Sequence, residues 1–431
     1  MLKKILMMGG GLLVLVAIGV GAFFFLGNKG IVTGQQVNLQ YWGLWEPKEV
    51  IEPLIAEYQK THKNVNITYT KQYHVQYRER LQAALQKVDG PDIFRFHNTW
   101  LPMLKNDLAP LSAGTVEENI YYPTVKKDLV INGTYYGIPL EYDGLVMFYN
   151  PDILSAGGVA VPTTWDEFRK AAETLTVKDS LGRIKTSGAA LGATGNVDFW
   201  SDILVLMMLQ NGTDMKKINN TVLPDGANAG VDTLNYYVQF VLGDNKTWDE
   251  TMGNSTSVFA SGKLAFLFGP SWIAHEIKAQ NSSLKFFAAQ VPQLASPGIN
   301  WASYWAEGIN KKSKGVKEAQ EFLKFLAQKE NLTKMYTSAG QAPRLFGEPY
   351  PRTDMAELVK DDQIVSQLLQ EALTAKSWYA SSRTFDNGIN DRIIKYLEDA
   401  VNALLQKKAQ APEALATAAK GIAQVLGEYG F

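Results

Sequence analysis

One short stretch of the sequence, "WASYWAEGIN" at residues 301–310, contains three large aromatic side chains. They are Trp301, Tyr304 and Trp305. A helix would put all three on one core-facing side, but the Pro and Gly residues in and around the stretch favour a short strand or a loop. A strand places Trp301 and Trp305 on one face and Tyr304 on the other. We therefore expect some of this aromatic surface to face a ligand.

Two carboxylates form a second pattern. Glu141 and Asp143 are two positions apart in a β-rich run, so both side chains project from the same face of a strand. Carboxylates accept strong hydrogen bonds from hydroxyl groups, and aromatic rings pack on flat apolar faces. Aromatic rings together with carboxylates are typical of a site for a sugar-like ligand. They are also typical of a glycoside hydrolase, which needs an acid and a second carboxylate at a set separation.

Other catalytic and metal-binding signatures are absent from the sequence. It has no G-x-S-x-G elbow and no G-x-x-x-x-G-K-[ST] loop, and "AHEIKAQ" at 274–280 lacks the second His of an H-E-x-x-H zinc motif. The four His residues are scattered, which leaves a metal site without support. Because the sequence holds no Cys, disulfides, thiolate ligands and a lipid-modified Cys anchor are excluded. We expect neither a metal nor a cofactor.

The composition is that of a globular protein. Of the 431 residues, 46% are apolar and 20% are charged, which supports a large core and two or three domains. The formal net charge of −1 gives no basis for binding a polyanion, so nucleic acid is not expected as a partner.

A long apolar run begins near the N-terminus. Residues 5–26 hold no charged side chain, and about 18 such residues are enough to span a bilayer. Lys3 and Lys4 favour a cytoplasmic N-terminus and an extracytoplasmic remainder. No small-residue cleavage site follows the run, so we expect a single-pass transmembrane anchor and tether over residues 1–36. A cleaved signal peptide is the alternative.

The rest of the chain alternates between strand and helix patterns. We predict strands at 37–42, 65–70 and 90–96 and helices at 47–61 and 77–88, an order typical of a mostly parallel sheet covered by helices. Farther on, Thr164 and Glu167 have the spacing of a helix capping box. The pattern also predicts a strand at 259–272 and helices at 199–212, 316–328 and 388–405.

These segments together resemble a known family. The motifs that carry the resemblance are, in chain order, "LQYWGLWEP", "LIAEYQKTHKNVNI", "GPDIF", "YYGIPLEYDGLVMFYNPDIL", "VPTTWDEFRKAAETLT", "FASGKLAFLFGPSW" and "EGINKKSKGVKEAQEFLKFL". From Val37 to its end, the chain is similar to bacterial extracellular solute-binding proteins of family 1, the maltodextrin-binding-like proteins that serve ABC importers.

The resemblance implies an α/β fold of the two-lobed, type II periplasmic-binding-protein class. The lobes would close on a ligand by a hinge motion. The chain would cross between them near Asp143, Phe268 and Gly308. One lobe would contain residues 37–143 and 268–308, and the other would contain residues 144–267 and 309–431.

The resemblance also implies ligand-binding residues. Asp143 lies close to the acidic hinge residue that holds sugar hydroxyls in the family, and Trp272 matches a stacking Trp, displaced here by the inserted Ser271. The candidates at the first lobe and the crossings are Trp42, Trp45, Glu46, His97, Asn98, Trp100, Glu141, Asp143 and Trp272. Trp301, Tyr304 and Trp305 join them as a ligand platform because of their own rings, since family members often carry small residues there; packing between the lobes is the alternative. Those in the second lobe are Asn196, Asp198, Trp378, Arg383 and Asp386. Core packing stays open for Trp42, and a structural hydrogen-bonding role stays open for His97.

The implied function is that of the extracytoplasmic substrate-binding component of an ABC importer, not an enzyme. A monomer held at the cell membrane through residues 5–26 would bind a sugar or oligosaccharide and deliver it to the permease subunits. A glycoside hydrolase and a receptor for a non-sugar solute are the alternatives. Signalling through this chain alone is disfavoured, because only Met1–Lys4 would lie inside the cell.

Overall fold

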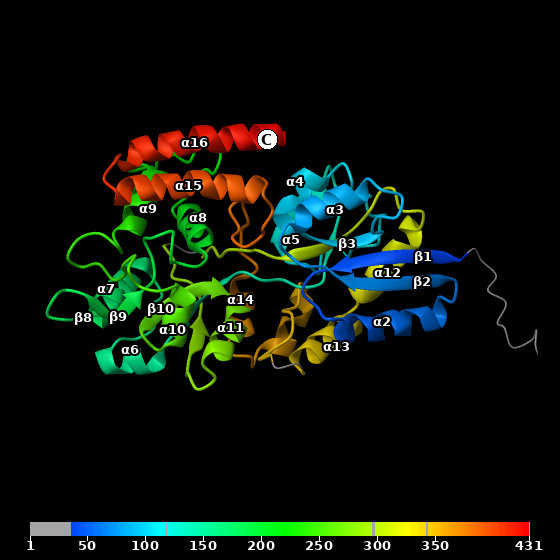
Figure 1. Ribbon diagram of the computed structural model, residues 1–431, viewed down its shortest axis with the longest axis horizontal. Helices are drawn as coiled ribbons and strands as arrows, with labels where there is room; N and C mark the ends of the chain where they lie inside the picture. Colours follow the sequence, from blue (N-terminus) through cyan, green and yellow to red (C-terminus); the bar gives the residue numbers. More distant parts are fainter. Residues whose placement is uncertain (1–35, 118, 295–297, 342–343, 431) are drawn as a thin grey trace, which may run out of the picture.

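The computed structural model has two α/β lobes side by side, with the C-terminal helices along one of them (Figure 1). It describes residues 36–117, 119–294, 298–341 and 344–430. The apolar run predicted to anchor the chain, residues 5–26, lies outside the described residues. Within the described ranges, no helix combines the length and the apolar character needed to cross a bilayer.

A mixed five-stranded sheet forms the centre of the first lobe, in the order β2-β1-β3-β12-β6. Its strands are β1 (Val37–Gly43), β2 (Val65–Lys71), β3 (Ile93–His97), β6 (Ile138–Pro139) and β12 (Trp305–Ile309). β1 pairs in parallel with β2 and β3, whereas β12 runs antiparallel to β3 and β6. A strand from far along the chain thus completes this sheet.

The second lobe contains another five-stranded sheet, in the order β11-β7-β10-β9-β8. Its strands are β7 (Leu145–Tyr149), β8 (Val177–Lys178), β9 (Ile184–Ala189), β10 (Leu264–Pro270) and β11 (Phe287–Ala289). β10 is buried along its whole length and pairs with β7 and β9. A small ribbon, β4 (Val130–Ile131) with β5 (Thr134–Tyr135), lies outside both sheets.

Helices cover both sheets (Figure 1). The first lobe carries α2 (Lys48–Thr61), α3 (Tyr77–Leu85), η1 (Asn98–Trp100), α4 (Leu101–Leu104), α5 (Pro123–Leu129), α12 (Val316–Leu326), α13 (Lys329–Gly340) and η2 (Thr353–Val359). The second carries α6 (Pro151–Gly157), α7 (Trp165–Leu175), α8 (Trp200–Gln210), α9 (Ala229–Val238), α10 (Ser255–Ala260), α11 (Ile273–Gln280), α15 (Ile389–Leu405) and α16 (Ala411–Glu428). α14 (Val365–Glu371) packs against both η2 and β7.

Local signals explain several boundaries. The predicted capping box is present: Glu167 N–H donates to Thr164 Oγ1, and the Glu167 carboxylate accepts from the Thr164 N–H. The helix predicted at 47–61 begins at Lys48 and continues through Pro53. The strand predicted at 259–272 is too long, because α10 occupies its first residues.

The first predicted crossing between the lobes is present. β6 belongs to the first sheet and β7 to the second, so the chain crosses between them, at Asp143. The crossing predicted near Phe268 is wrong, because Phe268 lies inside β10 and pairs with Met147 of β7. β11 also pairs with β7, so the strands β10 and β11 of the segment 268–308 belong to the second lobe.

The assignment of residues 309–431 to the second lobe is also wrong in its first part. α12 packs on α2 and β12, and α13 packs on α2, so both helices belong to the first lobe. The chain leaves that lobe after η2, and α15 and α16 then cover the second.

The crossing segments lie beside one another, and we refer to them together as the hinge. Gly144 pairs with Ala302, and Trp301 pairs with Lys376. The Ser303 N–H also donates to the Asp143 carbonyl at 3.0 Å. Three stretches far apart in sequence thus connect the lobes at one place.

Candidate ligand-binding site

A cavity of about 380 Å³ lies between the lobes, beside the hinge. Eight of the predicted site residues line it: Trp45, His97, Glu141, Asp143, Trp272, Trp301, Trp305 and Arg383. Residues that were not predicted line it as well, among them His74, Phe199, Asp202, Glu276, Ser303, Arg344, Glu348, Ser382, Thr384 and Phe385. Both lobes and two crossings therefore contribute to one site.

Indole rings form the first-lobe wall of this cavity. Trp305 begins β12 and pairs with His97 at the end of β3. The Trp305 ring contacts Trp45, His97 and Trp100 edge-on, with centroids 5.4, 5.0 and 5.2 Å away. Trp45 and Trp305 are half-buried, whereas Trp100 is fully buried. A buried aromatic layer therefore fixes the two rings that face the cavity.

His97 is part of this wall in its neutral form. Its Nε2 lies 3.0 Å from Ser303 Oγ, and its Nδ1 lies 2.8 Å from Thr99 Oγ1. Burial lowers the pKa of His97 to about 3. With both nitrogens engaged and no charge, His97 serves chiefly to position its neighbours.

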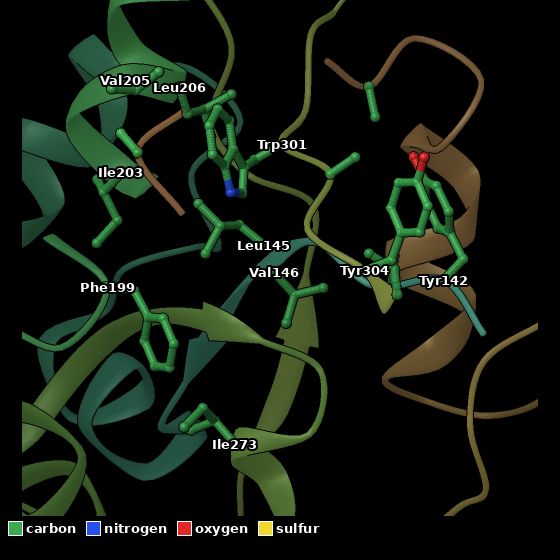
Figure 2. Close-up of a cluster of buried hydrophobic side chains, with 14 of the residues drawn as sticks. Tyr142, Leu145, Val146, Phe199, Ile203, Val205, Leu206, Ile273, Trp301 and Tyr304 are labelled. Atoms are coloured by element: carbon green, nitrogen blue, oxygen red, sulfur yellow. The ribbon is translucent and has the colours of Figure 1, made fainter. Parts of the chain in front are cut away.

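The aromatic stretch at 301–305 is one of the crossings, and its rings are divided between the lobes. Trp301 Nε1 donates to Asp202 Oδ1 on α8 of the second lobe at 2.8 Å. Tyr304 instead stacks on Tyr142 at 5.2 Å, and its hydroxyl donates to Asp128 on α5 of the first lobe. Figure 2 shows Trp301 and the stacked tyrosines on opposite sides of the crossing segment. Trp301 and Trp305 line the cavity, and Tyr304 does not.

The second-lobe wall combines two rings with a cation. The rings of Phe199 and Trp272 meet edge-on at 5.7 Å. The Arg383 guanidinium lies 4.7 Å from the Phe199 centroid and 5.5 Å from the Trp272 centroid. Asp198 Oδ1 accepts from Arg383 Nη2 at 2.9 Å, so Asp198 positions this cation from outside the cavity. The arrangement offers apolar faces and a hydrogen-bond donor together.

Buried carboxyls supply acceptors at the hinge end of the cavity. Glu141 Oε1 accepts from the Trp305 N–H at 2.7 Å. Asp143 accepts from the Ser271 N–H and hydroxyl, both at 3.0 Å, and from the Gly144 N–H at 2.7 Å. Burial raises the pKa of Asp143 to about 7 and that of Glu141 well above its usual range, and the nearby Glu348 charge adds to both shifts. Glu348 is itself paired with Arg344 at 2.6 Å.

Asp143→Asn should make stability less dependent on pH between 5 and 8. The folded-state pKa of about 7 lies above the unfolded value of about 3.9, so this group stabilises the fold at low pH. That contribution is lost as the pH rises through about 7, and Asn has no such proton to lose. Urea unfolding at pH 5 and pH 8 measures the difference.

Asp198→Asn is the matched control for this prediction. The pKa of Asp198 is lowered, by hydrogen bonds from Thr256 and the Arg383 charge that outweigh its burial, so it stays ionised across the whole window. A wild-type pH profile in the Asp143 variant would contradict the assignment. Other buried carboxyls should cause the pH dependence that remains, among them Asp202, whose pKa burial raises to about 6, and Glu371, whose pKa burial raises to about 7.

The other predicted site residues do not reach the cavity, and each has a structural partner instead. In the first lobe, Glu46 forms a buried ion pair with Arg95, and Asn98 donates to Asp128, the residue that Tyr304 also contacts. Trp42 packs half-buried against the core, and Trp100 lies fully buried behind Trp305. Trp42, Glu46, Asn98, Trp100 and Tyr304 thus lie outside the cavity and pack or hydrogen-bond within the fold.

Four of the second-lobe predictions, Asn196, Asp198, Trp378 and Asp386, also lie outside the cavity. Asn196 accepts from Trp248 Nε1 and donates to backbone carbonyls. Asp386 accepts from the N–H groups of Gly388 and Asn390 at the start of α15, and Trp378 packs against Tyr379. Of this group, Asp198 is nearest to the site, through Arg383.

Some lining residues could have been suspected from the sequence and others could not. Asp202 is an isolated acid inside the apolar helix α8, an unusual position that signals a buried partner, here Trp301. His74 and Phe385 carry no such signal, because the lobes bring them to the cavity from distant loops.

Two α/β lobes joined by a hinge around a cavity define the class of bilobed ligand-binding proteins. The chain belongs to the family of bacterial extracellular solute-binding proteins, whose model matches residues 53–346. The family predicted from the sequence motifs is confirmed by this match.

Curated relatives share low identity with the chain. The maltooligosaccharide ABC transporter solute-binding lipoprotein of Streptococcus pneumoniae is 23% identical over 405 residues, which cover 88% of each chain. The maltodextrin-binding protein MdxE of Bacillus subtilis is 24% identical, and its alignment spans 50% of this chain and 52% of that relative.

Solved structures share the fold. A cyclo/maltodextrin-binding protein complexed with maltotetraose superposes with a TM-score of 0.72 at 16% identity, covering 91% of this chain and 98% of the other. The cyclic α-maltosyl-1,6-maltose binding protein of Arthrobacter globiformis has the same TM-score at 17% identity, covering 91% and 100%. The expected two-lobed α/β architecture is thus confirmed.

Proposed function

We propose that this protein is the substrate-binding component of an ABC importer and that its cavity takes a sugar or oligosaccharide. The observation that carries the proposal is one interlobe cavity lined both by half-buried indoles, Trp45, Trp272 and Trp305, and by buried carboxyls, Glu141 and Asp143. Indole faces match the flat C–H faces of a sugar ring, and carboxyls match its hydroxyls. The names of the relatives, which refer to maltodextrin and maltooligosaccharide, support the same class of ligand.

Closure of the hinge would bury the ligand without chemical change. Asp143 accepts from Ser271 and Gly144, and Glu141 accepts from the Trp305 backbone, so both carboxyls are held in place beside the cavity. The proposed activity is binding and release, in keeping with the solute-binding family, and not hydrolysis.

The apolar run at residues 5–26 would hold the receptor at the membrane. The pneumococcal relative is named a lipoprotein, whereas this sequence contains no Cys to carry a lipid. A membrane-spanning segment would take the place of the lipid and keep the binding lobes, as a monomer, at a high effective concentration near the permease subunits.

A ligand titration tests the proposal. The full chain, purified in a detergent without a sugar headgroup, is titrated with mono- and oligosaccharides while tryptophan fluorescence and thermal stability are followed. We expect a saturable response to one sugar class and recovery of that sugar intact. Recovery of a cleaved sugar would replace the proposal with a glycoside hydrolase. No response to any sugar would point to a non-sugar solute.

Trp272→Ala should weaken sugar binding by about 5- to 15-fold, because it removes one face of the second-lobe wall and a cation–π partner of Arg383. Isothermal titration with the sugar found above measures the change. Trp272→Phe, which keeps an aromatic face, should lose less. Equal affinity in the wild type and the Ala variant would remove Trp272 from the site.

A further inference from the structure

The ends of four strands of the first sheet lie together at the far end of the first lobe. β1, β2 and β3 run parallel and begin there, and the antiparallel β12 ends there. This end points away from the second lobe (Figure 1). The cavity lies at the opposite ends of the same strands, where β3 ends at His97 and β12 begins at Trp305. The segments that precede β2 and β3 and follow β12 therefore share a surface remote from the cavity.

Direct contacts join these segments to the start of β1. The Val37 N–H donates to the Asn64 carbonyl at 2.8 Å. Gly315 packs so closely on Val37 that a Cβ at this glycine would lie 2.7 Å from the valine side chain. Lys312 Nζ donates to Gln86 Oε1 at 2.7 Å, which links the segment after β12 to the segment before β3. The three segments and the start of β1 thus form one continuous surface.

This surface is strongly basic. Its segments, residues 60–64, 86–92 and 310–317, contain seven lysines but only two acidic residues, Asp89 and Asp92. The Asp92 carboxylate already accepts two hydrogen bonds from the protein. All seven lysines are exposed, and within the described parts of the chain no ion pair involves any of them. They are Lys60, Lys63, Lys87, Lys311, Lys312, Lys314 and Lys317.

An exposed apolar side chain lies among these lysines. Val88 follows Lys87 directly and is 97% exposed, more than any other large hydrophobic side chain that the structure describes. A tight turn holds it there, because the Gly90 N–H donates to the Lys87 carbonyl at 3.4 Å. A fully exposed valine adds nothing to the core, whereas an apolar side chain among basic ones is typical of surfaces that bind anionic lipid. We name Val88 and the seven lysines the basic end of the first lobe.

The place of the apolar run in the sequence indicates the partner of the basic end. Nine residues, 27–35, separate the run at 5–26 from Gln36, the first described residue before β1. Even when fully extended, nine residues span only about 30 Å. A bilayer that holds the run would therefore lie within about 30 Å of the start of β1. That is the end of the lobe that carries the lysines.

We propose that the basic end docks on the membrane that holds the anchor, with its lysines against anionic lipid headgroups and Val88 inserted among them. The inference goes beyond solute binding, and it rests on the proposed membrane anchor, not on which ligand the cavity takes. Opposite charges attract the lysines to the lipid phosphates, and dissolved salt screens this attraction. Docking at this end keeps the cavity away from the lipid and open to solute.

A single fluorescent label tests the docking. Because the sequence has no Cys, Val88→Cys in the full chain provides one thiol for an environment-sensitive dye. The labelled protein is reconstituted into lipid nanodiscs of phosphatidylcholine, with or without phosphatidylglycerol. In the anionic discs we expect blue-shifted emission and about 3- to 10-fold more quenching by spin-labelled lipid. Both effects should be lost in about 0.5 M salt, where the screening length is only a few ångströms.

Leu181→Cys is the matched control for the label. Leu181 is 74% exposed and lies between β8 and β9, at the opposite end of the molecule (Figure 1). Its dye should give the same emission in both kinds of disc. An equal response of the two labels, or a Val88 label that responds equally to neutral and anionic lipid, would overturn the basic end as a docking surface.

Removal of charge tests the lysines themselves. Lys311→Gln with Lys314→Gln should reduce the response of the Val88 label to anionic lipid by about 3- to 10-fold. Lys216→Gln with Lys217→Gln removes two exposed lysines from the second lobe and should leave the response unchanged. Equal responses in the two double variants would contradict the proposal.

The same samples separate this proposal from the others. Failure of the full chain to enter either kind of disc would overturn the anchor and the docking surface together. Titration of the discs with the sugar found above reports on the proposed ligand, and its result does not depend on whether the basic end docks.

Discussion

Replacing Trp305 with Ala should weaken sugar binding by about 30- to 150-fold, a loss of about 2–3 kcal/mol. Trp305 is the central ring of the first-lobe wall, because it contacts Trp45, His97 and the buried Trp100. A large aromatic side chain fixed by a rigid layer is the kind of residue on which binding energy concentrates. Isothermal titration with the sugar identified by the panel measures the loss.

The fold should survive this substitution, because Trp305 is half-buried and its backbone N–H keeps the bond to Glu141. Trp42→Ala is the matched control: Trp42 is also a half-buried indole of the first sheet, but it does not line the cavity. The control should bind sugar as the wild type does. If both variants lost affinity equally, the effect would come from general weakening of the lobe, and the wall formed by Trp305 would lose its assigned role.

The sequence alone was enough to predict most of the local structure. Hydrophobic periodicity and the Thr164–Glu167 spacing depend on neighbours within a few residues, and the corresponding helices and strands are present. The order of the motifs was enough to predict the two-lobed class, and the family match and the structural neighbours confirm it.

Lobe membership could not be predicted in the same way. The pattern of β10 shows a buried strand, but only its pairing with β7 shows which sheet contains it. The spacing of Trp301 and Tyr304 predicted that the two rings lie on different faces. It could not predict that Asp202 and Asp128 would hold them in different lobes.

Contacts between distant parts of the chain also explain why only some of the predicted site residues line the cavity. Residues carried over from motifs next to strand ends, such as Trp45 and Asp143, line the cavity, as does Trp305 from the aromatic stretch. Glu46 and Asp386 have the right residue type in the right segment, but nearby donors already engage them, which only the folded geometry reveals.

Replacing Arg95 with Met should destabilise the protein by about 3–5 kcal/mol at neutral pH. Arg95 on β3 joins Glu46 after β1 to Glu307 on β12, at 2.5 and 2.6 Å, and all three side chains are at most 2% exposed. Tyr41 adds a hydrogen bond to Glu307 at 2.7 Å. Without the guanidinium, two carboxyls would remain buried with no cation between them. Urea unfolding followed by tryptophan fluorescence measures the change.

The same substitution should also weaken sugar binding, because the residues that Arg95 ties down are next to the site. Glu46 follows Trp45 directly, and Glu307 is two positions from Trp305 on the same strand. A combined Arg95→Met, Glu46→Gln, Glu307→Gln variant should recover much of the stability, since it removes the buried charges along with their partner.

Arg392→Met tests whether burial of the ion pair is the cause of the destabilisation expected for Arg95→Met. Arg392 and Glu428 also form a two-bond ion pair, at 2.5 and 2.7 Å, but their side chains are 38% and 46% exposed. Water solvates the carboxylate that such a substitution leaves behind, so stability should change little. If the Arg95 and Arg392 variants unfolded at the same urea concentration, the buried cluster would not be what holds β1, β3 and β12 together beneath the cavity.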